Sequence, residues 1–317
     1  MGGLALLFPG QASQAVGMGV DLMNAHAGAR RLFEQVDAVT GLAIVNLCAH
    51  GPLERLTATE VAQPAVVTTS LAALAVLRDA LGEALPEPRA VAGHSVGELA
   101  AYAAAGALDA PNCLQLVHVR AQAMADACAR VDGTMAAVLG MDEEPLRAVC
   151  VEASDASGSV EIANLNAPGQ LVISGERAAV SRAGDLARER GARRVLPLTV
   201  GGPFHSVYMH PAAERLQEAV AQAAVRDAAT PVVVNVTGRA ERDAAALRDE
   251  LNVQVFSPVR WIDTLRTMAE MGCDRFLEVG PGQVLTGLVK RTLSNVRVAS
   301  FGALADLDAT RALVAAD

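Results

Sequence analysis

The segment Gly93-His-Ser-Val-Gly97 has the spacing of a serine nucleophile elbow. It follows a short apolar run, Ala90–Ala92, and precedes an Ala-rich segment, Glu98–Ala105, which ends at Gly106. A strand, a tight turn and a helix in this order are the setting in which a G-x-S-x-G serine is exposed at the end of a sheet. The alternative is a Gly-Ser turn that only caps a helix. The context favours Ser95 as a nucleophile, with the next main-chain N–H facing an oxyanion.

A serine nucleophile needs a base, and His205 is the best placed of the six histidines. It lies in the loop Gly201–Ser206, after a predicted strand at Arg194–Val200. Sites in α/β sheets lie at the carboxyl ends of strands, and an imidazole can exchange a proton near neutral pH. The alternative is a loop histidine with no role. No histidine follows His210 and no acid stands out as a third member, so the chain order disfavours an ordinary hydrolase triad.

A single arginine indicates the class of substrate. The spacing predicts a helix over Pro111–Cys128, in which Cys113, Val117, Arg120 and Met124 share one face. That face is otherwise apolar and should point inward. A guanidinium stays charged when buried and needs an anion, yet no acid lies one helical turn away. The partner of this arginine is therefore either a carboxylate elsewhere in the chain or the carboxylate of a ligand.

The composition is that of a globular protein. Of 317 residues, 52% are hydrophobic and 19% are charged, which excludes disorder for most of the chain. The net charge of −9 argues against sequence-independent nucleic-acid binding. Five cysteines, never spaced as CxxC, predict free thiols in a reducing compartment. The longest uncharged stretch, Val61–Leu77, is shorter than the about 20 residues of a spanning helix, and the N-terminus lacks a basic signal region. We expect a cytoplasmic protein that binds neither nucleic acid nor membrane.

Short apolar runs between turn residues predict an α/β fold. The expected strands of one buried sheet are Leu4–Phe8, Ala90–Ala92, Val232–Val236, Arg275–Val279 and Val296–Ser300. We expect a long helix to start at Pro64, because proline suits the first helical turn.

The middle of the chain predicts a second, smaller unit. Its expected elements are a strand at Thr134–Leu139, a helix at Glu143–Glu152 with Asp142 as N-cap, strands at Val160–Asn164 and Gln170–Ser174, a helix at Arg177–Arg190 and a strand at Arg194–Val200. The order β-α-β-β-α-β is that of a ferredoxin-like unit. We therefore predict a larger α/β domain of residues 1–129 and 198–317, with a ferredoxin-like subdomain inserted at 130–197.

At this point the chain resembles a known family, the malonyl-CoA:acyl carrier protein transacylases of fatty acid synthesis, which are related to acyltransferase domains of polyketide synthases. The matching segments run nearly end to end: Phe8–Gln14, Gln63–Ala65, Gly93–Glu98, Arg120 in Val-His-Val-Arg, Asn164–Gln170, Pro203–Ser206, Gln254 followed by Ser257–Trp261, and Glu278–Gly282. Each is modest alone, but the set in this order is highly specific. Ala12 is a small departure, since the family often has glycine there. The resemblance implies an α/β-hydrolase-like core with an inserted ferredoxin-like subdomain.

The resemblance also implies the catalytic roles. Ser95 would be acylated, and His205 would act as base and then as acid. The main-chain N–H groups of Gln11 and Val96 would bind the oxyanion. Gln254 would orient His205 through its main chain, which would account for the missing acid.

Substrate and partner follow from the same resemblance. Arg120 would bind the free carboxylate of malonyl in a bidentate pair, Asn164 would contact the substrate, and the ring of Phe204 would leave little room for a methyl branch. The implied reaction is ping-pong: malonyl-CoA acylates the serine, coenzyme A leaves, and the phosphopantetheine thiol of acyl carrier protein takes the malonyl group. A basic patch would bind the acidic carrier protein, and its candidates are Arg193, Arg194, Lys290 and Arg291. Equally open is that these four charges only solvate the surface.

Three other functions remain as alternatives. The first is an acyltransferase of a polyketide synthase or malonate decarboxylase system. The second is a thioesterase or esterase, in which water replaces the second thiol; the chain order and a buried Arg120 count against it. The third is a non-catalytic acyl-binding module, which the intact Ser95, His205 and Arg120 disfavour. We expect a monomer with no metal and no redox cofactor.

Overall fold

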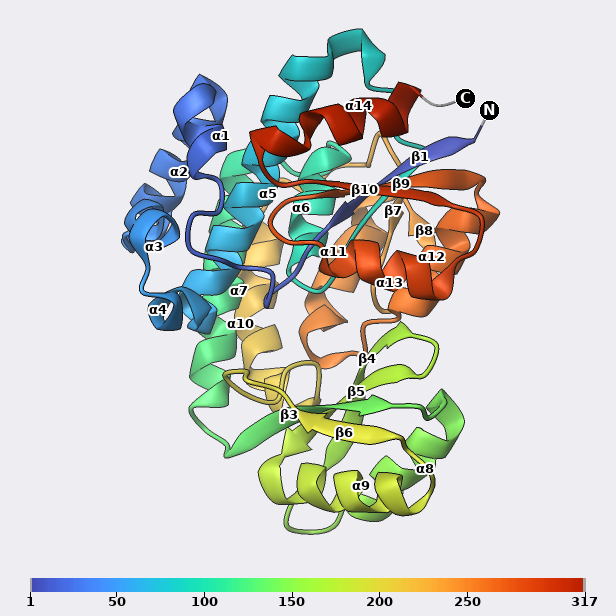
Figure 1. The fold of residues 1–317 in the computed structure, drawn as a ribbon. Coiled ribbons are helices and arrows are strands. Elements are labelled where there is room, and N and C mark those ends of the chain that lie inside the picture. Colours follow the sequence, from blue (N-terminus) through green and yellow to red (C-terminus); the bar gives the residue numbers. More distant parts are fainter. Residues whose placement is uncertain (1, 316–317) are drawn as a thin grey trace.

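Two β-sheets organise the computed structural model of the chain, which describes residues 2–315 (Figure 1). The larger sheet has the strand order β10-β9-β1-β2-β7-β8, and its strands are parallel except for β8 at one edge. Its bounds are β1 (Gly3–Phe8), β2 (Ala90–Gly93), β7 (Val232–Val233), β8 (Ala240–Glu241), β9 (Cys273–Val279) and β10 (Arg297–Phe301). The fold is therefore α/β with one mostly parallel and one antiparallel sheet.

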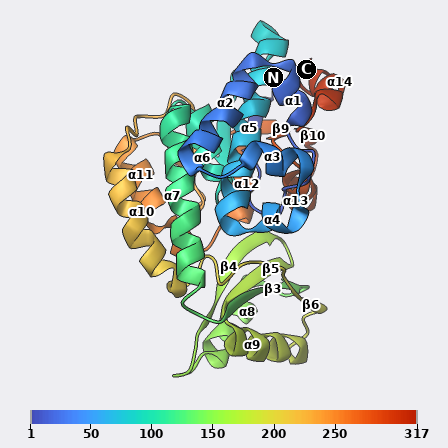
Figure 2. The ribbon, with the colours of Figure 1, turned by 90° about the vertical axis from the view of Figure 1, so that its left-hand side faces the viewer.

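Helices cover both faces of the larger sheet because successive side chains of a strand point to opposite faces. In β1, Leu4, Leu6 and Phe8 pack into the core on one face, whereas Ala5 and Leu7 pack into a second core on the other. The helices outside the smaller sheet are α1 (Val20–Ala25), α2 (Ala27–Thr40), α3 (Ile44–His50), α4 (Leu53–Thr57), α5 (Thr59–Leu81), α6 (Gly97–Ala104), α7 (Ala110–Cys128), α10 (His210–Gln222), α11 (Ala244–Val253), α12 (Trp261–Glu270), α13 (Val284–Thr292) and α14 (Leu307–Ala315). Side chains of α12 and α13 form the second core, and α2, α5, α6 and α7 contribute to the first (Figure 2).

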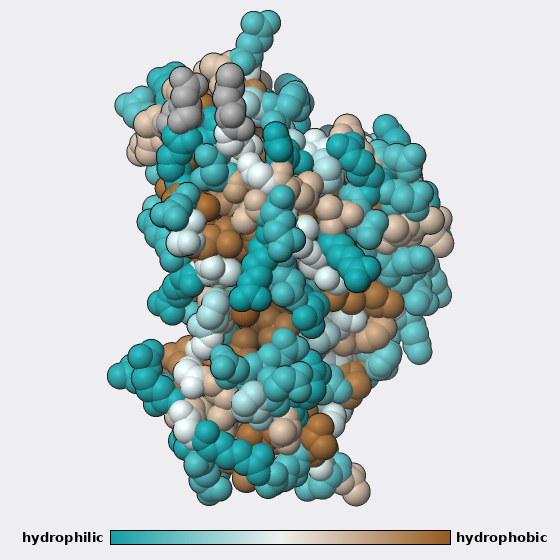
Figure 3. Space-filling view, turned by 90° about the vertical axis from the view of Figure 1, so that its right-hand side faces the viewer, coloured by the Kyte–Doolittle hydropathy of each residue, from teal (hydrophilic) through white to brown (hydrophobic). Residues whose placement is uncertain are grey.

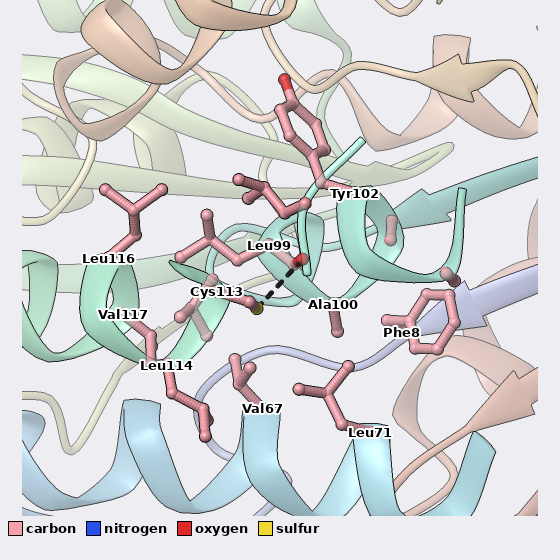
Figure 4. Packing of buried hydrophobic residues seen from close by; sticks show 14 of the residues in the cluster. Phe8, Val67, Leu71, Leu99, Ala100, Tyr102, Cys113, Leu114, Leu116 and Val117 are labelled. Carbon is pink, nitrogen blue, oxygen red and sulfur yellow. Dashed lines mark hydrogen bonds between the residues drawn. The ribbon is translucent and has the colours of Figure 1, made fainter. Parts of the chain in front are cut away.

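The inner face of α7 packs as its spacing predicts. Cys113 and Val117 are fully buried between α6 and α5 (Figure 4). The Cys113 thiol donates to the carbonyl of Leu99 at 3.3 Å, which joins α7 to α6. Asp109 caps the helix by accepting from the N–H of Asn112. This packing fixes the rotation of α7 and turns its buried face toward the end of β2.

The smaller sheet is antiparallel, with the order β4-β5-β3-β6. Its strands are β3 (Gly133–Leu139), β4 (Val160–Ala167), β5 (Gln170–Glu176) and β6 (Arg194–Pro197), and its helices are α8 (Glu143–Ala153) and α9 (Arg177–Glu189). Both helices pack on one face, around a core of their own (Figure 1). The opposite face of the sheet lies toward the larger sheet.

Four predicted boundaries are wrong by three residues or more, and one of them is the end of β4, which runs to Ala167 and not to Asn164. The helix expected to start at Pro64 begins at Thr59, because the N–H groups of Val61 and Ala62 already bond to the carbonyl of Ala58. The strand expected to extend to Val200 ends at Pro197: the N–H of Leu198 still bonds to the carbonyl of Met135, but that of Val200 turns back to the carbonyl of Leu198.

The fourth wrong boundary is that of β7, which ends at Val233 and not at Val236. The N–H of Val234 bonds to the carbonyl of Arg239, and the two N–H groups after it are taken by acids from two helices: Asn235 donates to Glu98 and Val236 donates to Glu250. In the smaller sheet, Asp142 stands at the expected N-cap of α8 but its side chain makes no capping hydrogen bond.

One helical segment, Thr59–Ala84, is long and apolar enough to cross a membrane, and 89% of its apolar window is buried inside the protein. The helices Ala27–Thr40 and Ile44–His50 meet the same test only when taken together, across a bend of 120°. The face in Figure 3 is mainly hydrophilic, with small hydrophobic patches in the indentation between the upper and lower parts. The long apolar helix is thus a core element, as the sequence predicts for Val61–Leu77.

Candidate active site

The turn between β2 and α6 has the geometry of a strained elbow. Ser95 has φ = 52°, in the left-handed region that residues with a side chain seldom adopt. A Cβ on Gly97 would lie 2.2 Å from the carbonyl oxygen of Phe8, and one on Gly93 would lie 2.0 Å from the carbonyl of Gly97. Only glycine permits these approaches, which press the elbow against the end of β1 and expose the serine at the carboxyl edge of the sheet.

His205 lies beside this serine, as the sequence predicts. Its Nε2 is 2.7 Å from the Oγ of Ser95, and its Nδ1 is 3.0 Å from the carbonyl oxygens of Gln254 and Ser257. Carbonyl oxygens only accept, so Nδ1 carries the proton and Nε2 is free to accept from the serine hydroxyl. The arrangement is that of a nucleophile with its base, oriented by two carbonyls in place of a carboxylate.

The surroundings of His205 hold the base in its neutral form. The side chain is 3% exposed. Burial, helped by the positive charge of Arg120, lowers the pKa of His205 to about 3, against the opposing effect of the Gln254 and Ser257 carbonyls. A neutral imidazole is the form that can take a proton from serine.

Arg120 projects from the buried face of α7 to the nucleophile. It is 2% exposed, and its Nη2 lies 3.1 Å from the Oγ of Ser95. Its other partners are neutral: Nη1 donates to Oε1 of Gln63 at 2.6 Å, and Nη2 donates to Oε1 of Gln254 at 3.0 Å. Burial lowers the pKa of Arg120 to about 10, opposed by the charge of Glu98, so it remains a cation at neutral pH. Within residues 2–315 it forms no ion pair, which leaves its charge available to an anionic ligand.

The expected oxyanion donors are positioned at the same place. Gln11 and Val96 line the cavity that contains Ser95. Neither main-chain N–H donates to an acceptor in the described part of the chain. Val96 directly precedes the first residue of α6, so the positive end of that helix also faces the developing charge.

A cavity of about 310 Å³ connects these groups and lies between the two sheets. The larger sheet contributes the loops after β1 and β2, and the smaller sheet contributes Met135, Asn164 and Val172. Phe204 lines the cavity next to His205 and is almost fully buried. The structure therefore brings the predicted substrate contacts, Phe204 and Asn164, to the same cavity as the predicted nucleophile.

The four predicted docking residues are exposed near the rim of this cavity. Lys290 and Arg291 lie in the last turn of α13, and Arg291 donates to the side chain of Gln170, which lines the cavity, at 2.8 Å. Arg194 is the first residue of β6, and Arg193 directly precedes it, beside the turn at Gly140. The N–H of Gly140 bonds to the carbonyl of the residue before Gln170, so the two basic pairs flank one part of the rim.

Some residues around the site had no role in the sequence analysis. Gln63 binds Arg120, and Ser257 supplies the second carbonyl to His205. His94 packs edge-on against Trp261, and its Nε2 lies 2.8 Å from Oδ1 of Asn166. Burial lowers the pKa of His94, against the effect of that hydrogen bond, so a neutral ring joins the elbow to the smaller sheet. All of these residues stand in the motifs quoted above, but no spacing rule specifies their contacts.

Two buried acids lie behind the site. Burial and the charge of Glu250 raise the pKa of Glu98 well above its usual value, although N–H donors and Arg120 act against the shift. Burial raises the pKa of Glu250 to about 7. In residues 2–315 no three side chains of the metal-ligating types form a cluster.

Comparison with known proteins gives one consistent result. The acyl transferase domain family matches residues 5–312. The chain is 42% identical to the malonyl CoA-acyl carrier protein transacylase of Bacillus subtilis over 92% of this chain and 90% of the relative. It is 38% identical to the enzyme of that name from Escherichia coli K12, over 94% and 95% of the two chains.

Solved structures agree with the sequence relatives. An acyl-carrier-protein S-malonyltransferase of Burkholderia pseudomallei superimposes with a TM-score of 0.92 at 41% identity, covering 98% of this chain and all of that one. A malonyl-transacylase solved in complex with a type II polyketide synthase acyl carrier protein has a TM-score of 0.92 at 36% identity, covering 98% and 99% of the two chains.

Proposed function

The chain belongs to the malonyl-CoA:acyl carrier protein transacylases of the acyl transferase family, and we propose that it transfers malonyl from coenzyme A to the phosphopantetheine thiol of an acyl carrier protein. One observation carries the proposal for the acyl group. The buried guanidinium of Arg120, which forms no ion pair with any residue of 2–315, lies 3.1 Å from the Oγ of Ser95, so an acyl chain on the serine can place a terminal carboxylate on it. An uncharged acyl group would leave that cation without an anion.

The first half-reaction acylates the serine. His205 takes the hydroxyl proton on Nε2 as the Oγ of Ser95 forms a bond to the thioester carbon. The main-chain N–H groups of Gln11 and Val96 bind the oxyanion. When the tetrahedral intermediate collapses, the carbon–sulfur bond breaks and the imidazolium returns the proton to the sulfur of coenzyme A. The product is a malonyl ester of Ser95.

The second half-reaction repeats these steps with another thiol. His205 takes the thiol proton of the phosphopantetheine group as the sulfur attacks the ester carbon. The carbon–oxygen bond to Ser95 breaks, and the serine regains its proton from the imidazolium. Arg120 holds the malonyl carboxylate through both halves in a bidentate pair. Phe204 and Asn164 restrict the shape of the acyl chain, since both line the cavity.

The finer assignment of the fold belongs to the same proposal. Residues 1–129 and 198–317 form an α/β-hydrolase-like core, and residues 130–197 form an inserted ferredoxin-like subdomain. The strand order β4-β5-β3-β6 and the two helices on one face support the second part, because a β-α-β-β-α-β unit folds in this way. We further propose a monomeric cytoplasmic enzyme of fatty acid biosynthesis that needs no metal or redox cofactor.

The basic rim is the proposed docking site for the carrier protein. Arg193, Arg194, Lys290 and Arg291 flank the cavity that a phosphopantetheine arm would enter. An acidic partner would be attracted despite the negative net charge of the whole chain. Reversal of the four charges should leave acylation by malonyl-CoA unchanged and slow transfer to carrier protein. Arg311→Glu, on α14, is the control. Transfer at the unaltered rate would refute the docking site.

Intact-protein mass spectrometry after brief mixing with malonyl-CoA tests the function. A malonyl adduct should form on the wild type and not on Ser95→Ala, and carrier protein should discharge it. Discharge by water at the same rate would indicate a hydrolase. Absence of an adduct, without release of coenzyme A, would contradict the proposed malonyl transfer.

A further inference from the structure

Glu98 is a fully buried acid three residues after the nucleophile, in the first turn of α6. It does not line the cavity, and within residues 2–315 its side chain forms no hydrogen bond to Ser95 or His205, although its main-chain N–H donates to the carbonyl of Ser95 at 3.1 Å. Its two oxygens have different donors. Oε1 accepts from the main-chain N–H of Asn235 at 2.9 Å, and Oε2 accepts from the side-chain amide of Gln254. Both donors are themselves bonded to the candidate active site.

Asn235 holds the elbow. Its Oδ1 accepts from the main-chain N–H of Ser95 at 2.7 Å, and its Nδ2 donates to the carbonyl of Gly93 at 2.7 Å. These bonds fix the residues on which the positive φ of Ser95 depends. The side chain is fully buried at the end of β7, so its position is set by the sheet.

Gln254 holds the arginine. Its Oε1 accepts from Nη2 of Arg120 at 3.0 Å, and its Nε2 donates to the carbonyl of Ser95 at 3.0 Å as well as to Glu98. Because Arg120 also donates to the Oγ of Ser95, the contacts close into a ring. The ring runs through Ser95, Asn235, Glu98, Gln254 and Arg120.

We propose that Glu98 is a positioning residue that fixes Arg120 relative to Ser95 and thereby sets the preference for an acyl group with a terminal carboxylate. The inference rests on the proposed malonyl transfer and adds a residue that never touches the substrate. Glu98 is the member of the ring that accepts on both sides. The N–H of Asn235 and the Nε2 of Gln254 can only donate, so the group between them must offer two acceptors, and these two bonds favour the carboxylate form of Glu98 against the effect of burial on its pKa.

The isosteric change Glu98→Gln separates this role from mere burial. Glutamine has one acceptor oxygen, and its NH₂ group only donates. In either orientation of the amide, one of the two donors loses its acceptor and faces another donor. When the side-chain amide of Gln254 is the donor that loses its acceptor, Gln254 is no longer held in place and Arg120 loses its fixed orientation. We expect kcat/KM for malonyl-CoA to fall about tenfold or more, as for loss of a buried hydrogen bond to a charged group.

The decisive readout is the ratio of kcat/KM for malonyl-CoA to that for acetyl-CoA. Glu98→Gln should lower this ratio, because acetyl has no carboxylate to place on Arg120. Glu278→Gln is the matched control: Glu278 is also fully buried and accepts from the N–H groups of Leu285 at 3.1 Å and Thr286 at 2.7 Å, but it contacts no member of the ring in the described part of the chain. The control should keep the wild-type ratio. An equal loss of kcat/KM with malonyl-CoA and with acetyl-CoA, or an unchanged ratio in Glu98→Gln, would overturn the inference.

A second variant covers the case in which Glu98→Gln does not fold. Gln254→Met removes the same side-chain bonds and keeps the main-chain carbonyl that binds His205, so it should also lower the ratio. Where both variants fold, the double variant should lose less than the sum of the two single losses, because both act through Arg120. Additive losses would contradict the inference that both residues act through Arg120. A wild type without a malonyl ester would refute the proposed function itself.

Discussion

Replacement of Arg120 by alanine should abolish the preference for a carboxylated acyl group while leaving the nucleophile and its base in contact. The Oγ of Ser95 and Nε2 of His205 are 2.7 Å apart, and this contact involves no atom of Arg120. The guanidinium is 2% exposed and lacks an ion pair within residues 2–315. Its main contribution to transfer would therefore be to the carboxylate of the bound acyl group.

The structure also sets the size of the effect. Removal of one partner of a buried, hydrogen-bonded charge pair costs about 2–5 kcal/mol, which is roughly 30- to 4000-fold in kcat/KM. The variant leaves the malonyl carboxylate buried without a cation, so malonyl-CoA should lose that amount. Acetyl-CoA has no such carboxylate, and its kcat/KM should be kept or raised. The kcat/KM of Arg120→Lys for malonyl-CoA should lie between those of the wild type and Arg120→Ala, because a single ammonium cannot form a bidentate pair.

Steady-state transfer from malonyl-CoA and from acetyl-CoA to carrier protein measures the ratio of the two kcat/KM values directly. Acetyl transfer serves as the internal control for folding, since it uses the same serine and base. Loss of both activities in Arg120→Ala would show only that the site had collapsed, and Arg120→Lys would then decide. An unchanged preference for malonyl in either variant would refute the assignment of Arg120 to the acyl carboxylate.

Two further predictions follow from the base and from the elbow. The pKa of His205 is lowered to about 3, and the neutral imidazole is the active base, so kcat/KM should not fall as pH drops through 6.5. A pH profile with a midpoint near 6.5 would contradict the lowering of the pKa of His205 by burial. The midpoint for kcat with malonyl-CoA should lie at a higher pH than the midpoint for kcat/KM, because a bound malonyl carboxylate would offset the charge of Arg120. Gly97→Ala should lower both activity and melting temperature, since its Cβ would lie 2.2 Å from the carbonyl oxygen of Phe8. A variant with wild-type melting temperature and activity would show that β1 and the elbow can separate.

Much of this architecture is predictable because it depends on local patterns. The apolar runs Leu4–Phe8 and Ala90–Ala92 indicate buried strands because they are short and end at proline or glycine, and the glycines around Ser95 specify the turn. The inward face of α7 follows from the spacing of Cys113, Val117 and Arg120, all of which are buried. Each of these features depends on residues within a few positions of one another.

The remaining features depend on contacts that no local pattern contains. The strand at β7 is shorter than predicted because Glu98 and Glu250, from two different helices, take the main-chain N–H groups that would extend it. Asn235 stands out in the sequence only through Asn-Val-Thr, the pattern of a glycosylation acceptor. Its side chain instead bonds to Ser95 and Gly93, which precede it by more than a hundred residues.

The absence of a catalytic acid has a physical explanation in this site. Two carbonyls orient His205, and no carboxylate contacts its ring in the described part of the chain. An aspartate in that position would stabilise the imidazolium, but it would also give Arg120 a competing anion beside the nucleophile. With neutral carbonyls, burial and the charge of Arg120 keep the base neutral before substrate binds. A malonyl carboxylate on Arg120 would offset that positive charge and raise the pKa of His205, which would favour the imidazolium that must protonate the leaving thiol. The substrate would thus supply the negative charge that an aspartate supplies in other serine enzymes, and only a carboxylated acyl group can do so.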